Sequence, residues 1–216
     1  MKLMHHIKKL IFLIVFIGFG AAHAGSFRDF FLAIQLDDAR TVQSLLKRGF
    51  DGNTRDERGQ PGLVLAIKEP SPKVTAVLMA WPGIQVDIRN RTDESPLMMA
   101  ALTGQIDLAE QLIARGADVN KTGWTPLHYA ASGGHAAIVK LLLKHHAYID
   151  AASPNGTTPL MMAAMYGTDT AATALLDEGA DINLRNQLTF NALEFAEQSG
   201  RDFMVELIAS RLKKQR

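Results

Sequence analysis

Apolar residues recur along this chain of 216 residues with a period of about 33. A large apolar residue is followed three positions later by an alanine at Phe30/Ala33, Leu63/Ala66, Leu97/Ala100, Leu127/Ala130, Leu160/Ala163 and Leu193/Ala196. Successive copies are therefore 33, 34, 30, 33 and 33 residues apart. Residues three positions apart share one face of a helix, so each copy predicts a short helix.

Two further markers repeat in the same phase. A second apolar stripe follows each copy and predicts a second helix: Val42/Leu45/Leu46, Val74/Leu78/Met79, Leu112/Ile113, Val139/Leu142/Leu143, Leu175/Leu176 and Val205/Ile208. Most units then close with a glycine, as in GADVN from Gly116 and GADIN from Gly179, which would end the helix in the left-handed conformation. The pattern predicts six helix–turn–helix units starting near residues 28, 60, 94, 124, 157 and 190.

Helices of about seven to ten residues are unstable alone in water, so the units must stack on one another. Thr125 is a suitable N-cap, and Pro126 suits the first helical position. Alanine pairs such as Ala130-Ala131 leave small flanks that let neighbouring helices approach closely. The pattern also varies: the junction before Trp124 is three residues short, an extra residue occurs near Trp81-Pro82, and His146 replaces a helix-ending glycine.

The repeat resembles the ankyrin repeat. The resemblance rests on Thr125-Pro126-Leu127-His128, Thr158-Pro159-Leu160, Ser95-Pro96-Leu97 and the two GAD-x-N closures. It implies an all-α ankyrin-repeat solenoid over residues 25–216, with β-turn or hairpin connections between units. In this family the histidine at His128 typically hydrogen-bonds to nearby backbone, and the units at the two ends act as caps.

Residues 1–24 have the layout of a secretory signal peptide: lysines at the start, an apolar run from Leu10 to Phe19, and Ala22-His23-Ala24 as cleavage site. The alternative is an uncleaved segment that tethers the protein to a membrane. A bilayer span needs about 20 apolar residues, roughly twice the length of this run. We therefore expect a periplasmic or secreted protein. With its signal-like segment, the chain resembles the bacterial periplasmic members of the ankyrin family.

Charge and composition exclude several classes of function. The chain has 23 basic and 22 acidic residues, and three lysines lie in residues 1–24, so the remainder has a net charge of 20 − 22 = −2. Such a balance gives no general reason to bind nucleic acid or, after signal cleavage, a membrane. No cysteine is present, so disulfides and thiolate chemistry are excluded. We expect a monomer.

The stretch WTPLHYAASGGH, residues 124–135, raises an alternative function, because two histidines and a serine could serve a metal-handling or hydrolytic protein. His135 and His145 bracket one helix, and ten residues separate them by about 15 Å. The chain has no G-x-S-x-G, no H-E-x-x-H and no phosphate-binding glycine loop. We therefore expect structural histidines, no enzyme activity, no cofactor and no metal.

The resemblance implies that the partner is another protein, held by the turn tips and first helices on a concave face. The variable positions there predict a binding set of Arg58, Arg91, Glu94, Leu102, Trp124, Met165, Tyr166 and Phe190. Trp124 and Phe190 are equally well explained as covers for a shortened junction and an end unit. Residues 146–183 contain five acids and no Lys or Arg, which predicts an acidic surface on the fifth unit.

Overall fold

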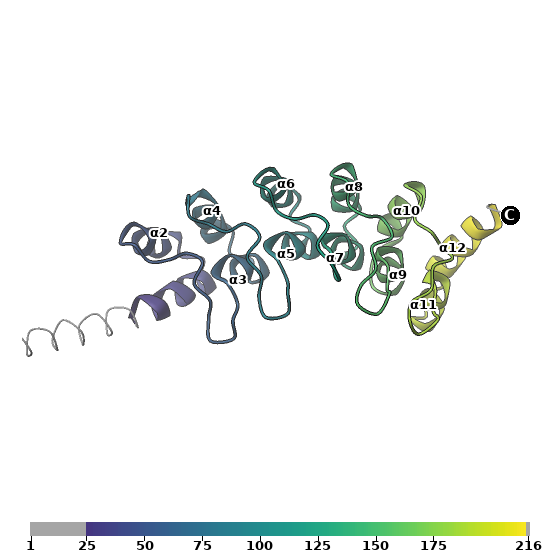
Figure 1. The fold of residues 1–216 in the computed structure, drawn as a ribbon, viewed down its shortest axis with the longest axis horizontal. Helices are drawn as coiled ribbons and strands as arrows, with labels where there is room; N and C mark the ends of the chain where they lie inside the picture. The colour runs from purple at the N-terminus through teal and green to yellow at the C-terminus, as the bar shows by residue number, and fades with distance from the viewer. Residues whose placement is uncertain (1–24, 215–216) are drawn as a thin grey trace, which may run out of the picture. The chain divides into compact units, whose positions relative to one another are not determined.

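The computed structural model describes residues 25–214, and the proposed signal segment at residues 1–24 lies outside that range. The chain forms two compact units that divide after Ile84. In the first, a helix over residues 25–35 is followed by α2 (Ala39–Lys47), α3 (Gly62–Lys68) and α4 (Pro72–Ala80). The second contains α5 (Pro96–Thr103), α6 (Ile106–Ala114), α7 (Pro126–Gly133), α8 (Ala136–Lys144), α9 (Pro159–Met165), α10 (Asp169–Asp177), α11 (Ala192–Gln198) and α12 (Asp202–Lys214) (Figure 1).

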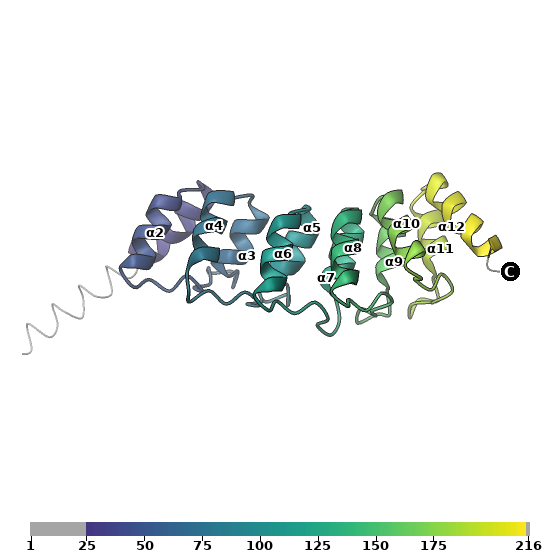
Figure 2. The ribbon, with the colours of Figure 1, turned by 90° about the horizontal axis from the view of Figure 1, so that it is seen from above.

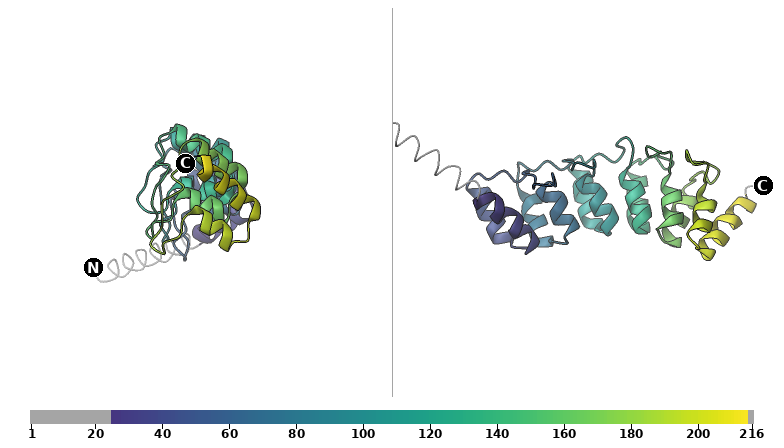
Figure 3. Two further views of the ribbon diagram at one scale, coloured as in Figure 1. Left: turned by 90° about the vertical axis from the view of Figure 1, so that its right-hand side faces the viewer. Right: turned by 90° about the horizontal axis from the view of Figure 1, so that it is seen from below.

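The all-α fold class is confirmed. Each leucine–alanine marker lies in the first helix of a pair, and each later apolar stripe lies in the second. Across residues 25–214, β pairing is limited to a single antiparallel bridge between Arg55 and Pro61. The connections are otherwise turns within each pair and longer loops between pairs, and the longer loops run along one end of the helices within each unit (Figure 3).

Within the second unit, the pairs stack in two rows of helices (Figure 2). The first helices α5, α7, α9 and α11 contact one another in sequence, and the second helices α6, α8, α10 and α12 do the same. The marker residues form the core of this stack, since Leu97, Leu127 and Leu160 are fully buried. Each pair therefore covers the apolar face of the pair beside it.

Small residues let the first helices of neighbouring pairs approach backbone to backbone. Ala131 in α7 and Ala164 in α9 are completely buried. A Cβ atom added to Gly133 would lie 2.6 Å from the carbonyl oxygen of Leu102, and one added to Gly167 would overlap the carbonyl oxygen of Ala131. At the end of the stack, Glu197 occupies the position that corresponds to Ala164 and is exposed, as a terminal cap requires.

A single polar residue anchors most of the loops. The side chains of Asp56, Asn90 and Asn186 each accept backbone N–H bonds from the residues two and four positions on. Ser153 does the same for the residue four positions on. Three positions after each anchor the chain is left-handed, at Gly59, Asp93, Gly156 and Thr189.

The shortened junction before Trp124 has a different anchor. Lys121 is buried, and its ammonium group donates to the carbonyl oxygens of Thr122 and Trp124, each at 3.0 Å. It also forms an ion pair with Asp93 in the preceding loop. A buried cation thus replaces the acceptor side chain that holds the longer loops.

The predicted helix ends are confirmed. Gly116 and Gly179 have φ angles of +87° and +93°, and His146 follows α8 with a φ of 63°. A non-glycine residue in this region costs on the order of 1 kcal/mol. The carbonyl oxygen of His146 accepts a bond of 2.7 Å from the side chain of Asn120, which helps to fix this conformation.

Candidate protein-binding surface

The candidate site is the set of exposed or half-buried positions where the first helices of the second unit end, which we call the first-helix surface: Leu102, Thr103, Ser132, Met165 and Tyr166. Leu102 is 38% exposed near the end of α5, and Tyr166 is 60% exposed at the end of α9. Met165 is half-buried. Because α5, α7 and α9 are neighbours, these side chains lie on adjacent helices.

Hydrogen bonds between pairs fix the spacing of the first-helix surface. The ring of His135 donates from Nε2 to the carbonyl oxygen of Leu102 at 3.0 Å. The hydroxyl of Thr168 donates in the same way to the carbonyl oxygen of Gly134 at 2.8 Å. Arg201 continues the pattern with bonds to the carbonyl oxygens of Ala163 and Ala164. The residue just before each of α8, α10 and α12 therefore ties that second helix to the first helix of the preceding repeat.

Two predicted partner-binding residues lie in the loop before α5. Arg91 is exposed, whereas Glu94 is half-buried and already bonded. The carboxylate of Glu94 accepts bonds from Asn90 at 2.6 Å and from the hydroxyl of Tyr129 at 3.1 Å. Burial and the neighbouring Glu94 raise the pKa of Tyr129, so its hydroxyl stays protonated and donates. Glu94 thus joins one repeat to the next, in addition to any contact with a partner.

The two predicted aromatic residues of the loops are half-buried. The ring of Trp124 lies edge-on to that of His128, with centroids 5.2 Å apart. Phe190 lies edge-on to Phe195 at 6.1 Å. Each side chain covers its own repeat and still has an accessible part. Arg58, the remaining predicted residue, is exposed in a loop of the first unit.

Comparison with known proteins agrees with this architecture. The family model for ankyrin repeats in three copies matches residues 30–122, 63–153, 120–186 and 148–215. The chain belongs to the ankyrin-repeat family. Its ankyrin repeats are 33% identical over 162 residues to the nuclear factor NF-kappa-B p105 subunit of Gallus gallus, and 35% identical over 156 residues to the ankyrin repeat and KH domain-containing protein mask-1 of Caenorhabditis elegans.

These matches cover most of the chain but little of the relatives. They include 72% and 70% of the chain, yet only 16% and 6% of the two proteins. A further match, to the E3 ubiquitin-protein ligase Ufd4 of Drosophila melanogaster, is 35% identical over 109 residues, which is 50% of the chain and 4% of that protein. The similarity therefore concerns the repeats and not the whole relatives.

His128 of the fourth ankyrin repeat is fully buried and hydrogen-bonded to backbone, as the resemblance implied. Its Nε2 is 2.9 Å from the carbonyl oxygen of Thr157 in the next repeat, and its Nδ1 is 3.1 Å from the backbone nitrogen of Thr125. A carbonyl oxygen can only accept, so Nε2 must carry the proton and Nδ1 must accept. Burial lowers the pKa of His128 to about 4, so the ring is neutral near pH 7.

The histidines do not converge in the structure. His128 and His135 each bond to a backbone carbonyl oxygen of a different repeat. Among residues 25–214, no group of three or more His, Asp or Glu side chains is arranged to hold a metal ion. Over the same residues, no helix is both long and apolar enough to cross a bilayer.

The acidic surface predicted for the fifth ankyrin repeat is partly neutralised. Asp177 forms an ion pair of 2.7 Å with Arg211, and Asp169 lies 3.9 Å from Arg201. Both arginines come from the sixth repeat, beyond the segment from which the acidic surface was predicted. Asp150 and Asp181 remain close together, and burial raises the pKa of Asp150. The acidic character is therefore concentrated in the loops that follow α8 and α10, where Asp150, Asp181 and the exposed Glu178 lie.

Sequence reasoning missed the charged network around the shortened junction. Arg89 pairs with Asp87 at 2.9 Å and with Asp93 and Asp118 at 3.4 Å. Asp93 also pairs with Lys121, and these contacts hold the pKa of Asp93 below its usual range. The shortened junction, which contains Lys121, is the one signal in the sequence that could have drawn attention to this network.

We predict that His128 makes the ankyrin stack less stable in mildly acidic solution. The unfolded chain binds a proton on this residue below about pH 6.5, whereas the folded chain does so only near pH 4. Stability is therefore lost as the pH falls between these values, and the loss amounts to about 2 kcal/mol between roughly pH 7 and pH 4.5. Denaturant unfolding at a series of pH values measures it.

His128→Gln is the control, because it lacks the titrating group and keeps every carboxylate. The stability difference between the unsubstituted chain and this variant should shrink by the same amount over that range. A difference that stays constant with pH would contradict the assignment.

Proposed function

We propose that this protein is an exported, non-enzymatic adaptor whose first-helix surface binds a partner protein. Ankyrin repeats generally mediate protein–protein interaction, and the chain belongs to that family.

The observation that carries the proposal is the contrast between the scaffold and the first-helix surface. Across the described chain, every buried side-chain nitrogen and oxygen has a hydrogen-bond partner. On that rigid support, Leu102 at the end of α5 and Tyr166 at the end of α9 leave apolar area in water, with α7 between them. Exposed aromatic and large apolar side chains beside charged loops are typical of the anchors of a protein interface.

We propose that the protein is not an enzyme, because of the way its buried histidine is bonded. The buried His128 uses both ring nitrogens in structural bonds and has no free side to serve as a base. The match to the ligase Ufd4 involves 4% of that protein, so it gives little support for a ligase activity in this chain.

Export is proposed from the signal-like pattern of residues 1–24. A short apolar run preceded by lysines and followed by an alanine pair spaced by one residue favours cleavage after Ala24. We propose a periplasmic or secreted location for the repeats.

Binding of the partner protein is predicted to depend on Tyr166. Replacing Tyr166 by Ala removes the most exposed aromatic ring of the first-helix surface and should weaken capture of the partner about tenfold or more, as expected for an aromatic anchor. Crosslinking and affinity capture from the native compartment, followed by binding measurements with the captured protein, give the comparison.

Tyr148→Ala is the matched control, since Tyr148 is equally exposed, at 68%, but lies between α8 and α9. It should bind as the unsubstituted chain does. Equal binding by both variants would remove the first-helix surface from the proposal, and the lack of any specific partner would contradict the adaptor role.

Export predicts a mature chain that starts at Gly25. Amino-terminal sequencing of protein recovered from the extracytoplasmic fraction of expressing cells tests this directly. A chain that retains Met1 and remains with the membrane would favour the tethered alternative.

A further inference from the structure

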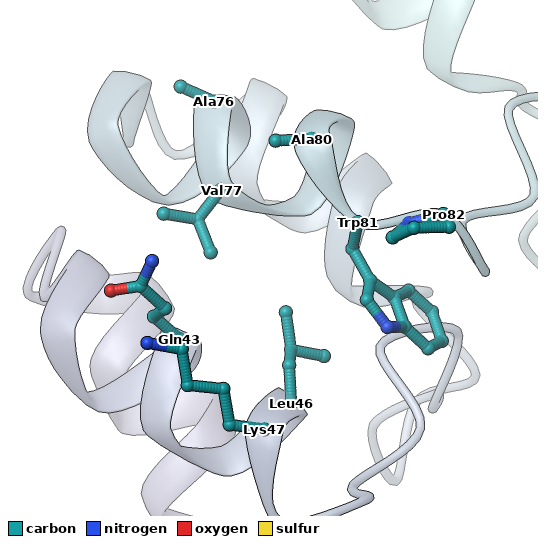
Figure 4. Close-up of a pocket in the computed structure, with 8 residues that line it drawn as sticks. All are labelled: Gln43, Leu46, Lys47, Ala76, Val77, Ala80, Trp81 and Pro82. Carbon is teal, nitrogen blue, oxygen red and sulfur yellow. The ribbon is translucent and has the colours of Figure 1, made fainter.

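A pocket lies in the first unit, whereas the proposed partner surface is formed by residues of the second unit. It opens between α2 and α4, has a volume of about 410 Å³, and is lined by Gln43, Leu46, Lys47, Ala76, Val77, Ala80, Trp81 and Pro82 (Figure 4). Its size is within the range of small-molecule sites. It lies on second helices, so the repeats' first helices take no part in it.

One wall of the pocket is built around Trp81. A Cβ atom added to Gly52 would lie 2.9 Å from the indole ring, and one added to Gly83 would lie 2.6 Å from it. Because neither glycine has a Cβ atom, the indole ring has room to lie against both of them. The side chain of Asn53 ties the two loops together with a bond of 2.9 Å to the carbonyl oxygen of Gly83. The aromatic wall is thus held in place by its surroundings.

The apolar and the polar residues that line the pocket lie in different parts of it. Leu46, Val77 and the indole of Trp81 provide the apolar surfaces, together with Ala76, Ala80 and Pro82. The amide of Gln43 and the ammonium of Lys47 lie one turn apart along α2. A ligand that fits has an apolar body and one polar end.

The one charged side chain that lines the pocket is that of Lys47, whereas Asp38 and Asp51, the acids that flank α2, do not line it. Neither α2 nor α4 contains an acidic residue, while α2 carries Arg40 and Lys47 and α4 carries Lys73. The second helices α6 and α10 differ, because they contain acids such as Asp107 and Asp169. An anion is therefore favoured at the polar end, and a cation is disfavoured.

We propose that this pocket binds a small anionic amphiphile, namely a single carboxylate attached to an apolar chain. The chain packs on Leu46, Val77 and Trp81, and the carboxylate lies against the ammonium of Lys47 and the amide of Gln43. Charge-assisted hydrogen bonds of this kind are stronger than those between neutral groups. The helices that form the walls use their backbone groups internally, so a peptide would find few partners for its own backbone there.

The test uses decanoate as the probe and Trp81 as the reporter. The chain has two tryptophans, so Trp124→Phe leaves Trp81 as the sole indole. Titration with decanoate below its micellar concentration should change the Trp81 emission in a saturable way. Decanol, with the same chain length and no charge, should bind more weakly.

Lys47→Gln should weaken decanoate binding about three- to fivefold, in line with the modest strength of an exposed ion pair. Lys68→Gln is the matched control, because Lys68 also lies in the last turn of a helix in this unit but does not line the pocket. It should bind decanoate unchanged. Calorimetric titration of the chain with Trp124 intact provides the same ranking without relying on the fluorescent variant.

Three results would overturn the proposal. They are the absence of saturable binding, equal affinity for decanol and decanoate, and equal effects of Lys47→Gln and Lys68→Gln. Saturable binding that follows the predicted order of ligands and variants supports it.

Discussion

The close approach of successive first helices is the constraint on which the second unit depends. Gly133 lies against the carbonyl oxygen of Leu102, and Gly167 lies against that of Ala131, with no room for a Cβ atom at either place. This contact lets short helices bury the leucines that they cannot bury alone. It also holds their ends in a regular row, because the same bonds from His135 and Thr168 to the preceding helix recur along the stack.

The proposed function depends on the side chains that this packing leaves exposed or half-buried. Leu102, Ser132 and Met165 occupy the same place in successive repeats, 30 and 33 residues apart, and carry different side chains. The buried positions beside them are uniformly alanine or glycine. A rigid support of this kind lets recognition change through a few exposed side chains while the fold stays constant. In the first unit, the second helices α2 and α4 form a largely apolar pocket whose one charged lining residue is Lys47.

The fold could be predicted from the sequence because its signals are local and repeated. Capping at Thr125, the left-handed His146 and the backbone bonds of His128 all follow from residues within one repeat or from the family pattern. Contacts between repeats could not be read in this way. The bond of Tyr129 to Glu94 spans 35 residues, and the ion pair of Arg211 with Asp177 spans 34. Both depend on which side chains the stacking brings together, so the acidic surface was overestimated and the internal role of Glu94 was missed.

The most direct test of the stacking constraint is the free energy of unfolding of Gly167→Ala, compared with that of Gly116→Ala. Gly116 has a left-handed conformation but open space around it, so its substitution costs only the conformational penalty of about 1 kcal/mol. Gly167→Ala forces a methyl group against a backbone carbonyl that cannot move freely, and we expect a loss of about 3 kcal/mol. A loss at Gly167 equal to or smaller than that at Gly116 would contradict the account.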